Sequence, residues 1–183
     1  MKKQGNCKHL TISKQEEKMY KEELSIISQA ILNEIEGYEF YKMAGNQASS
    51  EGTKEAFLEL AGEELKHADY LKKLWGKLSN GGEVSIEDII ESGIEIPSPE
   101  IYRWGKIDES STSVAMSVFG IGMQMEQSSI VFYEDAKKKV KSKASMELFD
   151  LLIGWEKVHL KQFSEQYSIL KEDWWAEQGF APF

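Results

Sequence analysis

The sequence predicts an all-α fold: an antiparallel four-helix bundle in which two helical hairpins are joined by a long crossover. Only 3 of its 183 residues are proline, so long stretches can remain helical. Along four of these stretches apolar residues recur at gaps of three and four, the spacing of one face of a helix. The two halves of the chain also resemble each other, which indicates that one hairpin is repeated.

The expected elements follow one another in two pairs. Polar residues 1–18 are expected to form an N-terminal arm, and residues 19–171 the bundle. The helices are predicted over about residues 19–48, 54–78, 113–139 and 145–171. Short polar turns separate the members of each pair, so each pair should fold back on itself as an antiparallel hairpin.

The segment 79–112 is predicted to be the crossover. It contains Pro97 and Pro99, and Ser85 to Asp88 resembles a capping box that would begin one short helix. A helix of about 24 residues is roughly 36 Å long, a distance that this segment can span. Beyond the bundle, residues 172–183 form a tail rich in aromatic residues. We expect it to pack on the bundle or on a second subunit, with docking to a larger assembly as the alternative.

Composition excludes several classes of function. The net charge of −9 disfavours nucleic acid, which binds basic surfaces, and favours metal cations as ligands. Cys7 is the single cysteine, so neither a disulfide framework nor a Cys-x-x-Cys metal site can form. The N-terminal residues lack the apolar core of a signal peptide, and no run of about 18 apolar residues occurs. A cytoplasmic protein without a membrane span is therefore expected.

The internal repeat has a shift of 92 residues. Between residues 34–67 and 126–159, 11 of 34 positions are identical without a gap. Glu34 and Glu64 are 30 residues apart, as are Glu126 and Glu156, with the turn of each hairpin near the midpoint. A chain that runs out from the first glutamate and back to the second returns to about the same height. All four glutamates can therefore lie in one layer of the bundle.

Six ionisable residues occupy positions where the apolar stripes of the four helices would otherwise continue. They are Glu34, Glu64, His67, Glu126, Glu156 and His159. Four buried carboxylates would repel one another and lose their hydration, but two divalent cations would balance their charge. Two neutral imidazoles would complete the coordination. Oxygen and imidazole ligands suit iron or manganese, and the lack of cysteine ligands argues against structural zinc.

A solvated helix face is the alternative reading of one Glu-x-x-His motif, since glutamate is abundant in this chain. The repeat makes a metal site the better interpretation, because both motifs lie in register with an earlier glutamate. The remaining alternative is a bundle whose six polar residues have only a structural role. Glu63 and Lys66 are predicted to be solvated, because the repeat replaces them with Trp155 and Val158.

These residues resemble the rubrerythrin-like branch of the ferritin-like superfamily over about residues 20–170. The matching segments are Glu34-Ile-Glu-Gly-Tyr-Glu-Phe-Tyr41, Glu63-Glu-Leu-Lys-His67, Glu126-Gln-Ser-Ser-Ile-Val-Phe-Tyr133 and Glu156-Lys-Val-His159. The resemblance implies two irons with Glu34 and Glu126 as terminal ligands and Glu64 and Glu156 as bridging ligands. It also implies one histidine ligand for each iron, His67 and His159.

The same resemblance implies that Tyr41 and Tyr133 donate hydrogen bonds to ligand carboxylates; the alternative is a core tyrosine whose hydroxyl is satisfied elsewhere. Two departures from the family pattern are informative. Typical members carry an extra glutamate one turn after the third-helix ligand, tied to iron movement between redox states, but this chain has Ser129 there. They also carry a rubredoxin-like domain with four cysteine ligands, which a chain with Cys7 alone cannot build.

Three functions follow from these observations. The first is a diiron oxidoreductase that reduces hydrogen peroxide or dioxygen with electrons from an external donor, rubredoxin-like or similar. The second is a ferritin-like protein that oxidises ferrous ion for storage or transfer, and the third is a scaffold or sensor stabilised by its metal. Two iron ions are expected, with manganese or a mixed site as alternatives, in a protein that forms a homodimer.

Overall fold

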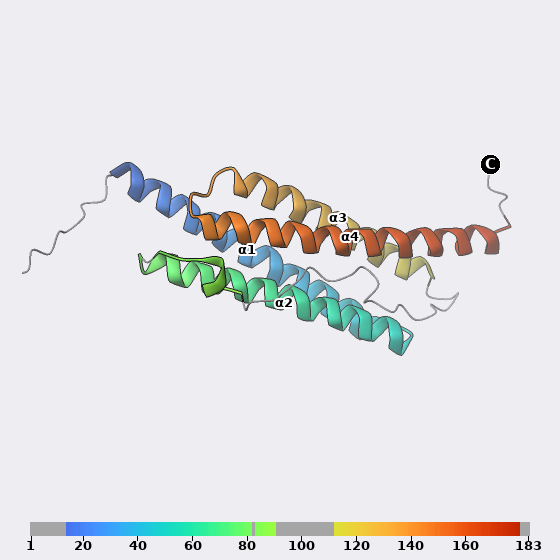
Figure 1. Cartoon of the computed structure of the whole chain (residues 1–183). Coiled ribbons are helices and arrows are strands. Elements are labelled where there is room, and N and C mark those ends of the chain that lie inside the picture. Colours follow the sequence, from blue (N-terminus) through green and yellow to red (C-terminus); the bar gives the residue numbers. More distant parts are fainter. Residues whose placement is uncertain (1–13, 82, 91–111, 180–183) are drawn as a thin grey trace, which may run out of the picture.

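The computed structural model describes residues 14–81, 83–90 and 112–179, which form helices and short connections (Figure 1). The helices are α1 (Lys14–Gln47), α2 (Glu51–Ser79), the short 3-10 helix η1 (Ile86–Asp88), α3 (Thr112–Lys137) and α4 (Lys143–Glu177). α1 pairs with α2 and α3 pairs with α4, each pair as an antiparallel hairpin (Figure 1). α2 and α3 run in the same direction, so the end of α2 and the beginning of α3 lie at opposite ends of the bundle. The predicted fold class is confirmed.

Two helix ends differ from the expectation. α1 begins at Lys14 rather than near residue 19, and α4 continues to Glu177 rather than ending near residue 171. No proline interrupts α4, and Gly179, two residues after its end, has a left-handed backbone at φ 68°. Trp174 and Trp175 therefore belong to α4 instead of a separate tail. Residues 1–13, which include Cys7, and residues 180–183 lie outside the described part of the chain.

Serine caps begin the second helix of each hairpin. The Ser50 hydroxyl accepts a hydrogen bond from the Thr53 N–H at 3.2 Å, and the Ser142 hydroxyl accepts one from the Ser145 N–H at 3.1 Å. Each bond satisfies an N–H group that the first helical turn leaves without a partner. Within the crossover the predicted capping box, Ser85 with Asp88, is confirmed at the start of η1. The crossover residues 91–111 lie outside the described residues.

The apolar core is divided into two clusters. One contains Leu71 and Leu148 and lies toward the α3–α4 turn, and the other contains Phe57 and Phe163 and lies toward the α1–α2 turn. On every long helix the residues of the two clusters stand on opposite sides of the ionisable positions along the sequence. The helical periodicity therefore places a polar layer in the middle of the bundle, with apolar packing above and below it.

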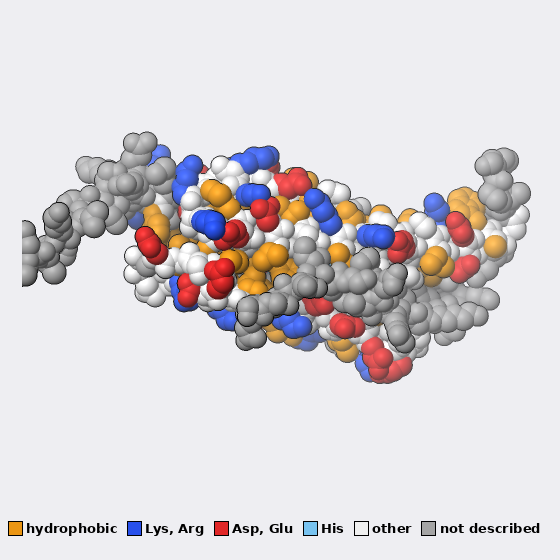
Figure 2. Space-filling model, viewed as in Figure 1, with side chains coloured by type: hydrophobic (Ala, Val, Ile, Leu, Met, Phe, Trp, Pro, Cys, Tyr) orange, Lys and Arg blue, Asp and Glu red, His pale blue; other side chains and the backbone are white. Residues whose placement is uncertain are grey.

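The surface shows both signs of charge. Acidic and basic side chains are interspersed along the face of the bundle that Figure 2 shows. Among the described helices, none combines the length and the apolar character that crossing a membrane would require.

Candidate metal centre

The six ionisable residues that the repeat singled out meet in one layer of the bundle. Each of the four long helices contributes, and every one of these residues is at most 4% exposed. Their potential ligand atoms form two groups, and within each group the atoms lie within 4.8 Å of one another. The first group contains Glu34, Glu64, His67 and Glu156, and the second contains Glu64, Glu126, Glu156 and His159. The predicted single layer of glutamates is therefore present.

Glu64 and Glu156 belong to both groups, and each offers one carboxylate oxygen to each side. On the His67 side, Nδ1 lies 3.7 Å from Glu64 Oε2 and 3.6 Å from Glu156 Oε1. On the His159 side, Nδ1 lies 3.2 Å from Glu64 Oε1 and 3.4 Å from Glu156 Oε2. This is the arrangement expected of two carboxylates that bridge two cations.

Glu34 and Glu126 each belong to one group. Glu34 Oε2 lies 3.2 Å from His67 Nδ1, and Glu126 Oε2 lies 3.6 Å from His159 Nδ1. Each histidine thus turns Nδ1 toward the carboxylates, and the two imidazole rings stand 6.0 Å apart. The cluster has approximate twofold symmetry, because each hairpin supplies one terminal glutamate and one Glu-x-x-His pair.

Two buried tyrosines connect the hairpins at this layer. The Tyr41 hydroxyl on α1 donates a hydrogen bond to Glu126 on α3, and the Tyr133 hydroxyl on α3 donates one to Glu34 on α1. The expected contacts between these tyrosines and carboxylates of the cluster are present, and each tyrosine reaches the first-helix glutamate of the other hairpin. Burial, followed by the nearby carboxylates, raises the pKa of both tyrosines, so both remain hydrogen-bond donors.

The charges of the cluster are strongly coupled. Burial and repulsion from neighbouring glutamates raise the pKa of Glu34 and of Glu126 well above the usual carboxyl range. Burial alone would lower the pKa of His67 and His159, but their carboxylate contacts outweigh it and raise both.

Burial would raise the pKa of Glu64 and Glu156 as well, but contacts that include both histidines lower it. Without a cation, Glu34, Glu126 and both histidines therefore hold their protons more tightly than such groups usually do. Divalent cations would replace those protons as the source of positive charge.

Three buried carboxylate oxygens support a cation as the missing partner. Among the described residues, Glu64 Oε1 and both oxygens of Glu156 have no hydrogen-bond donor. A buried carboxylate oxygen without a donor is costly, whereas coordination to a cation satisfies it. Four carboxylates and two imidazoles are the donor set that ferritin-like bundles use for two iron or manganese ions, and the residues present fit such a pair.

A glycine leaves room for one of the shared carboxylates. A Cβ atom at Gly37, one turn after Glu34, would lie 3.3 Å from the Cγ and Oε2 atoms of Glu64. This separation is tighter than an ordinary van der Waals contact, so glycine lets α1 approach the Glu64 side chain.

Glu63 was predicted to be solvated, and this prediction is wrong. Its side chain is 15% exposed, and its Oε2 atom lies 3.0 Å from His159 Nε2. The sequence reasoning set Glu63 aside because the repeat replaces it with Trp155. Its position directly before Glu64 was the available signal, since that face of α2 turns toward α4. The companion prediction for Lys66, an exposed residue, is confirmed.

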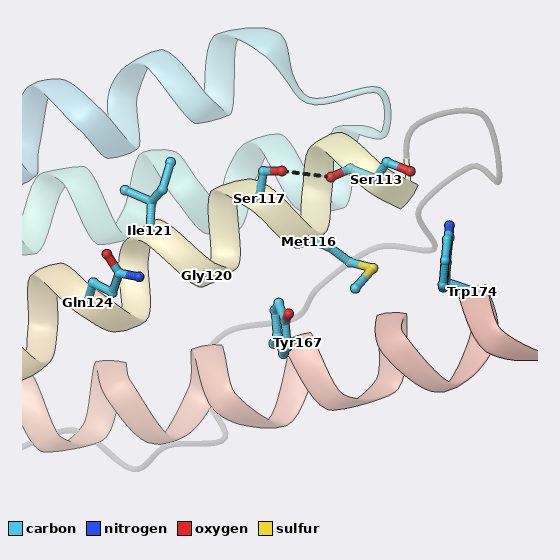
Figure 3. Close-up of a pocket in the computed structure, with 8 residues that line it drawn as sticks. All are labelled: Ser113, Met116, Ser117, Gly120, Ile121, Gln124, Tyr167 and Trp174. Atoms are coloured by element: carbon cyan, nitrogen blue, oxygen red, sulfur yellow. Dashed lines mark hydrogen bonds between the residues drawn. The ribbon is translucent and has the colours of Figure 1, made fainter. Parts of the chain in front are cut away.

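A groove on the surface between α3 and α4 is separate from the cluster. It has a volume of about 580 Å³, and none of the six clustered residues lines it. Figure 3 shows Met116 and Tyr167 pointing into the space between the two helices, with Trp174 at one end. Trp174 thus lines one end of the groove, while Trp175 is 43% exposed.

The fold and the cluster together define a class: a ferritin-like four-helix bundle with a carboxylate–histidine centre. Residues 25–167 match the family model described as rubrerythrin, and the chain belongs to the rubrerythrin family. Among solved structures, the chain is similar to a hypothetical protein from Pyrococcus furiosus with 25% identity and a TM-score of 0.62. The match covers 82% of this chain and 90% of that one. A comparison with curated proteins found no match.

Proposed function

We propose that this protein is a diiron-carboxylate oxidoreductase that reduces hydrogen peroxide or dioxygen to water with electrons from an external donor protein. The observation that carries the proposal is the geometry of Glu64 and Glu156, which each direct one oxygen toward each histidine. This arrangement suits two adjacent cations. An iron pair bound there would supply two electrons to an O–O bond, and peroxide with two electrons and two protons yields two waters. Dioxygen needs four electrons and four protons for the same product, and the further two electrons would come from the external donor.

The protein side chains would hold, orient and shield the centre. Glu34 with His67 and Glu126 with His159 would each hold one metal, while Glu64 and Glu156 would bridge the two. The hydroxyls of Tyr41 and Tyr133 would keep the terminal carboxylates oriented by donating to them. The two apolar clusters exclude water from both sides of the layer. Carboxylates of the cluster would accept and return protons locally.

Peroxide consumption by the iron-loaded, reduced protein tests the proposal. We expect rapid oxidation of the wild-type centre by peroxide and slow oxidation of the variant carrying Glu64→Ala and His67→Ala. Glu59→Gln, an exposed position on α2, is the matched control and should behave as wild type. Equal oxidation rates in the wild type and the double variant would overturn the proposal. Metal analysis of the isolated protein would establish whether iron or manganese occupies the site.

The electron donor and the oligomer are also proposals. A chain with one cysteine cannot form a four-cysteine iron site, so the electrons would come from a separate rubredoxin-like or similar protein. We expect a homodimer, with a native mass twice the 20.9 kDa of one chain. A large shell with mineral, together with fast ferrous oxidation and no peroxide reduction, would instead indicate iron storage.

A further inference from the structure

The two histidines of the cluster have different neighbours on the side away from the clustered carboxylates. His159 turns Nδ1 toward the clustered carboxylates, and its other ring nitrogen, Nε2, lies 3.0 Å from Glu63 Oε2. The ring therefore lies between the cluster and a carboxylate outside it. With Nε2–H donating to Glu63, the imidazole is held in the tautomer whose Nδ1 lone pair faces the cluster.

Trp155 takes the place of Glu63 in the other half of the repeat. It stands directly before Glu156, as Glu63 stands directly before Glu64, and the shift between the two positions is 92 residues. Its ring packs against His67 with centroids 4.9 Å apart and an angle of 35° between the planes. The indole of tryptophan can only donate a hydrogen bond. Trp155 therefore cannot accept one from His67 in the way that Glu63 accepts one from His159.

This difference bears on how tightly each half of the centre holds a metal. A carboxylate that accepts a hydrogen bond from a ligating histidine raises the basicity of the ligand and fixes its orientation. Loss of such a partner typically weakens metal affinity by about 10–100-fold. Glu63 also brings a fifth carboxylate close to the His159 side, where its charge favours a bound cation.

We infer that the two metal positions are unequal and that Glu63 makes the position of Glu126 and His159 the tighter one. The position of Glu34 and His67, lined by Trp155, is the weaker and fills second. Glu63 is a positioning residue, since it acts on the metal through His159. The inference rests on the proposed two-metal centre, but it concerns occupancy and is independent of the reaction catalysed there.

Titration of the metal-free protein with Co²⁺, followed by calorimetry and visible absorption, tests the inference. We expect two binding steps separated by about tenfold or more in wild type. Glu63→Gln removes the carboxylate charge with little change in shape, and it should weaken the first step by about 10–100-fold. Glu59→Gln, at an exposed site one turn earlier on α2, should leave both steps unchanged.

Single-site backgrounds separate positioning from a merely structural contact. In His67→Ala protein the remaining site contains His159, and Glu63→Gln should weaken Co²⁺ binding by the same factor. In His159→Ala protein, Glu63→Gln should change Co²⁺ affinity less than about twofold, because the contact is already absent. Equal weakening in both backgrounds, or none in either, would overturn the inference, as would two equal sites in wild type.

The outcomes also separate this inference from the proposed function. Unequal Co²⁺ sites in a protein whose reduced iron form reacts with neither peroxide nor dioxygen would leave the inference standing and refute the oxidoreductase. Two equal sites in a protein that reduces peroxide would do the reverse. Failure of the wild-type protein to bind Co²⁺ would overturn both.

Discussion

The α1–α2 and α3–α4 hairpins share the residues that meet at the centre and differ in the residues that surround it. Each supplies a terminal glutamate, a Glu-x-x-His pair and a tyrosine that reaches across to the other hairpin. The residues next to the two histidines differ, however: Glu63 lies beside His159, whereas Trp155, its counterpart in the repeat, lies beside His67. The repeat preserves the six clustered residues, because two cations of the same kind would need the same donor types. The surrounding positions can diverge, and through them the two halves of one centre acquire different properties.

The two hairpins also differ in how one pair of apolar core residues divides its volume between a smaller and a larger side chain. Gly122 and Phe163 occupy the positions that hold Ala30 and Leu71 in the first half. A Cβ atom at Gly122 would lie 2.9 Å from the Phe163 ring, closer than two carbon atoms can approach. The larger aromatic ring on α4 is therefore accommodated by the smaller residue on α3. The halves keep similar combined volume with different shapes.

The turns of the two hairpins are also held differently. Buried Glu23 on α1 accepts hydrogen bonds from the backbone N–H groups of Lys141 and Ser142 and from the Ser145 hydroxyl. The carboxylate thus ties the first hairpin to the beginning of α4. The corresponding residue in the second half is Ala115, which lines a small cavity of about 50 Å³ beside the α1–α2 turn.

The largest effect is expected from removing a shared glutamate. Glu156→Gln should reduce bound metal from about two ions per chain to below one, because Glu156 offers an oxygen to each side of the centre. Glu64→Gln should do the same if the hairpins are equivalent at this position. Metal analysis after dialysis would measure it, with the exposed α4 site Glu172→Gln as the control. Full occupancy in either variant would contradict the shared role.

Acidity should control metal binding. Because the raised pKa values of Glu34, Glu126 and the two histidines make these groups hold protons more tightly in the metal-free protein, metal loading should release protons. Apparent affinity should therefore rise with pH and fall on acidification. Calorimetry in buffers of different ionisation enthalpy would count the protons, and a pH-independent affinity would contradict the coupling.

The same shifts predict how the metal-free protein responds to pH. Groups whose pKa is raised in the folded state stabilise it at low pH and lose that contribution as pH rises through the folded value. The thermal midpoint of metal-free protein should therefore fall as pH rises above the ordinary carboxyl pKa range, through Glu34 and Glu126, and fall further above the ordinary imidazole pKa, through the histidines. The metal-loaded protein should resist this loss. The lowered pKa values of Glu64 and Glu156 act in the opposite direction and only at acid pH. Parallel pH profiles with and without metal would contradict the prediction.

The packing of Gly122 against Phe163 can be tested by replacing this pair with alanine and leucine, the pair that the first hairpin has at the corresponding positions. Gly122→Ala should lower the free energy of unfolding by about 1–3 kcal/mol, because the new methyl group overlaps Phe163. Adding Phe163→Leu should relieve the overlap, with a favourable coupling of about 0.5–3 kcal/mol in a denaturant-unfolding cycle. Gly62→Ala is the control, since nothing lies within 4 Å of a Cβ there and a small stabilisation is expected. If the changes in unfolding free energy of the two substitutions simply added, the proposed steric dependence between positions 122 and 163 would be contradicted.

The smallest effect concerns the contact of Glu23 with the turn between α3 and α4. Glu23→Gln should lower the free energy of unfolding by about 1–2 kcal/mol, because one of the carboxylate acceptors becomes an amide donor facing backbone N–H groups. The neighbouring exposed residue provides the control, Glu22→Gln, with a change near zero. Urea unfolding at fixed pH would measure both. Equal values for the two variants would show that the contact adds nothing to stability.

The sequence predicted most of the fold and all six residues of the candidate centre. Helical spacing placed Glu34 and its five counterparts on inward faces, and the 92-residue shift placed them at one height. The ends of α1 and α4 were less predictable, because polar segments such as residues 14–18 have neither a breaker nor an apolar stripe. Whether they extend a helix depends on small differences in propensity.

Glu63 was missed for a different reason. Periodicity divides a helix into an inner and an outer face, but α2 has neighbours on more than one side. A residue one step from Glu64 can therefore turn toward α4 and meet His159 rather than solvent. Likewise, Tyr41 was expected to contact a ligand carboxylate, but which one depends on how the hairpins face each other.

By itself, the sequence determined which side chains of each hairpin point inward and at what height they meet, because helix geometry and chain direction are local properties. Only the tertiary structure decided which hairpin each tyrosine reaches, that Glu63 stands behind His159 and that Trp155 stands beside His67. Those contacts join residues far apart in the chain. They depend on the packing angle between the two hairpins, and the similarity of the hairpin sequences does not specify that angle.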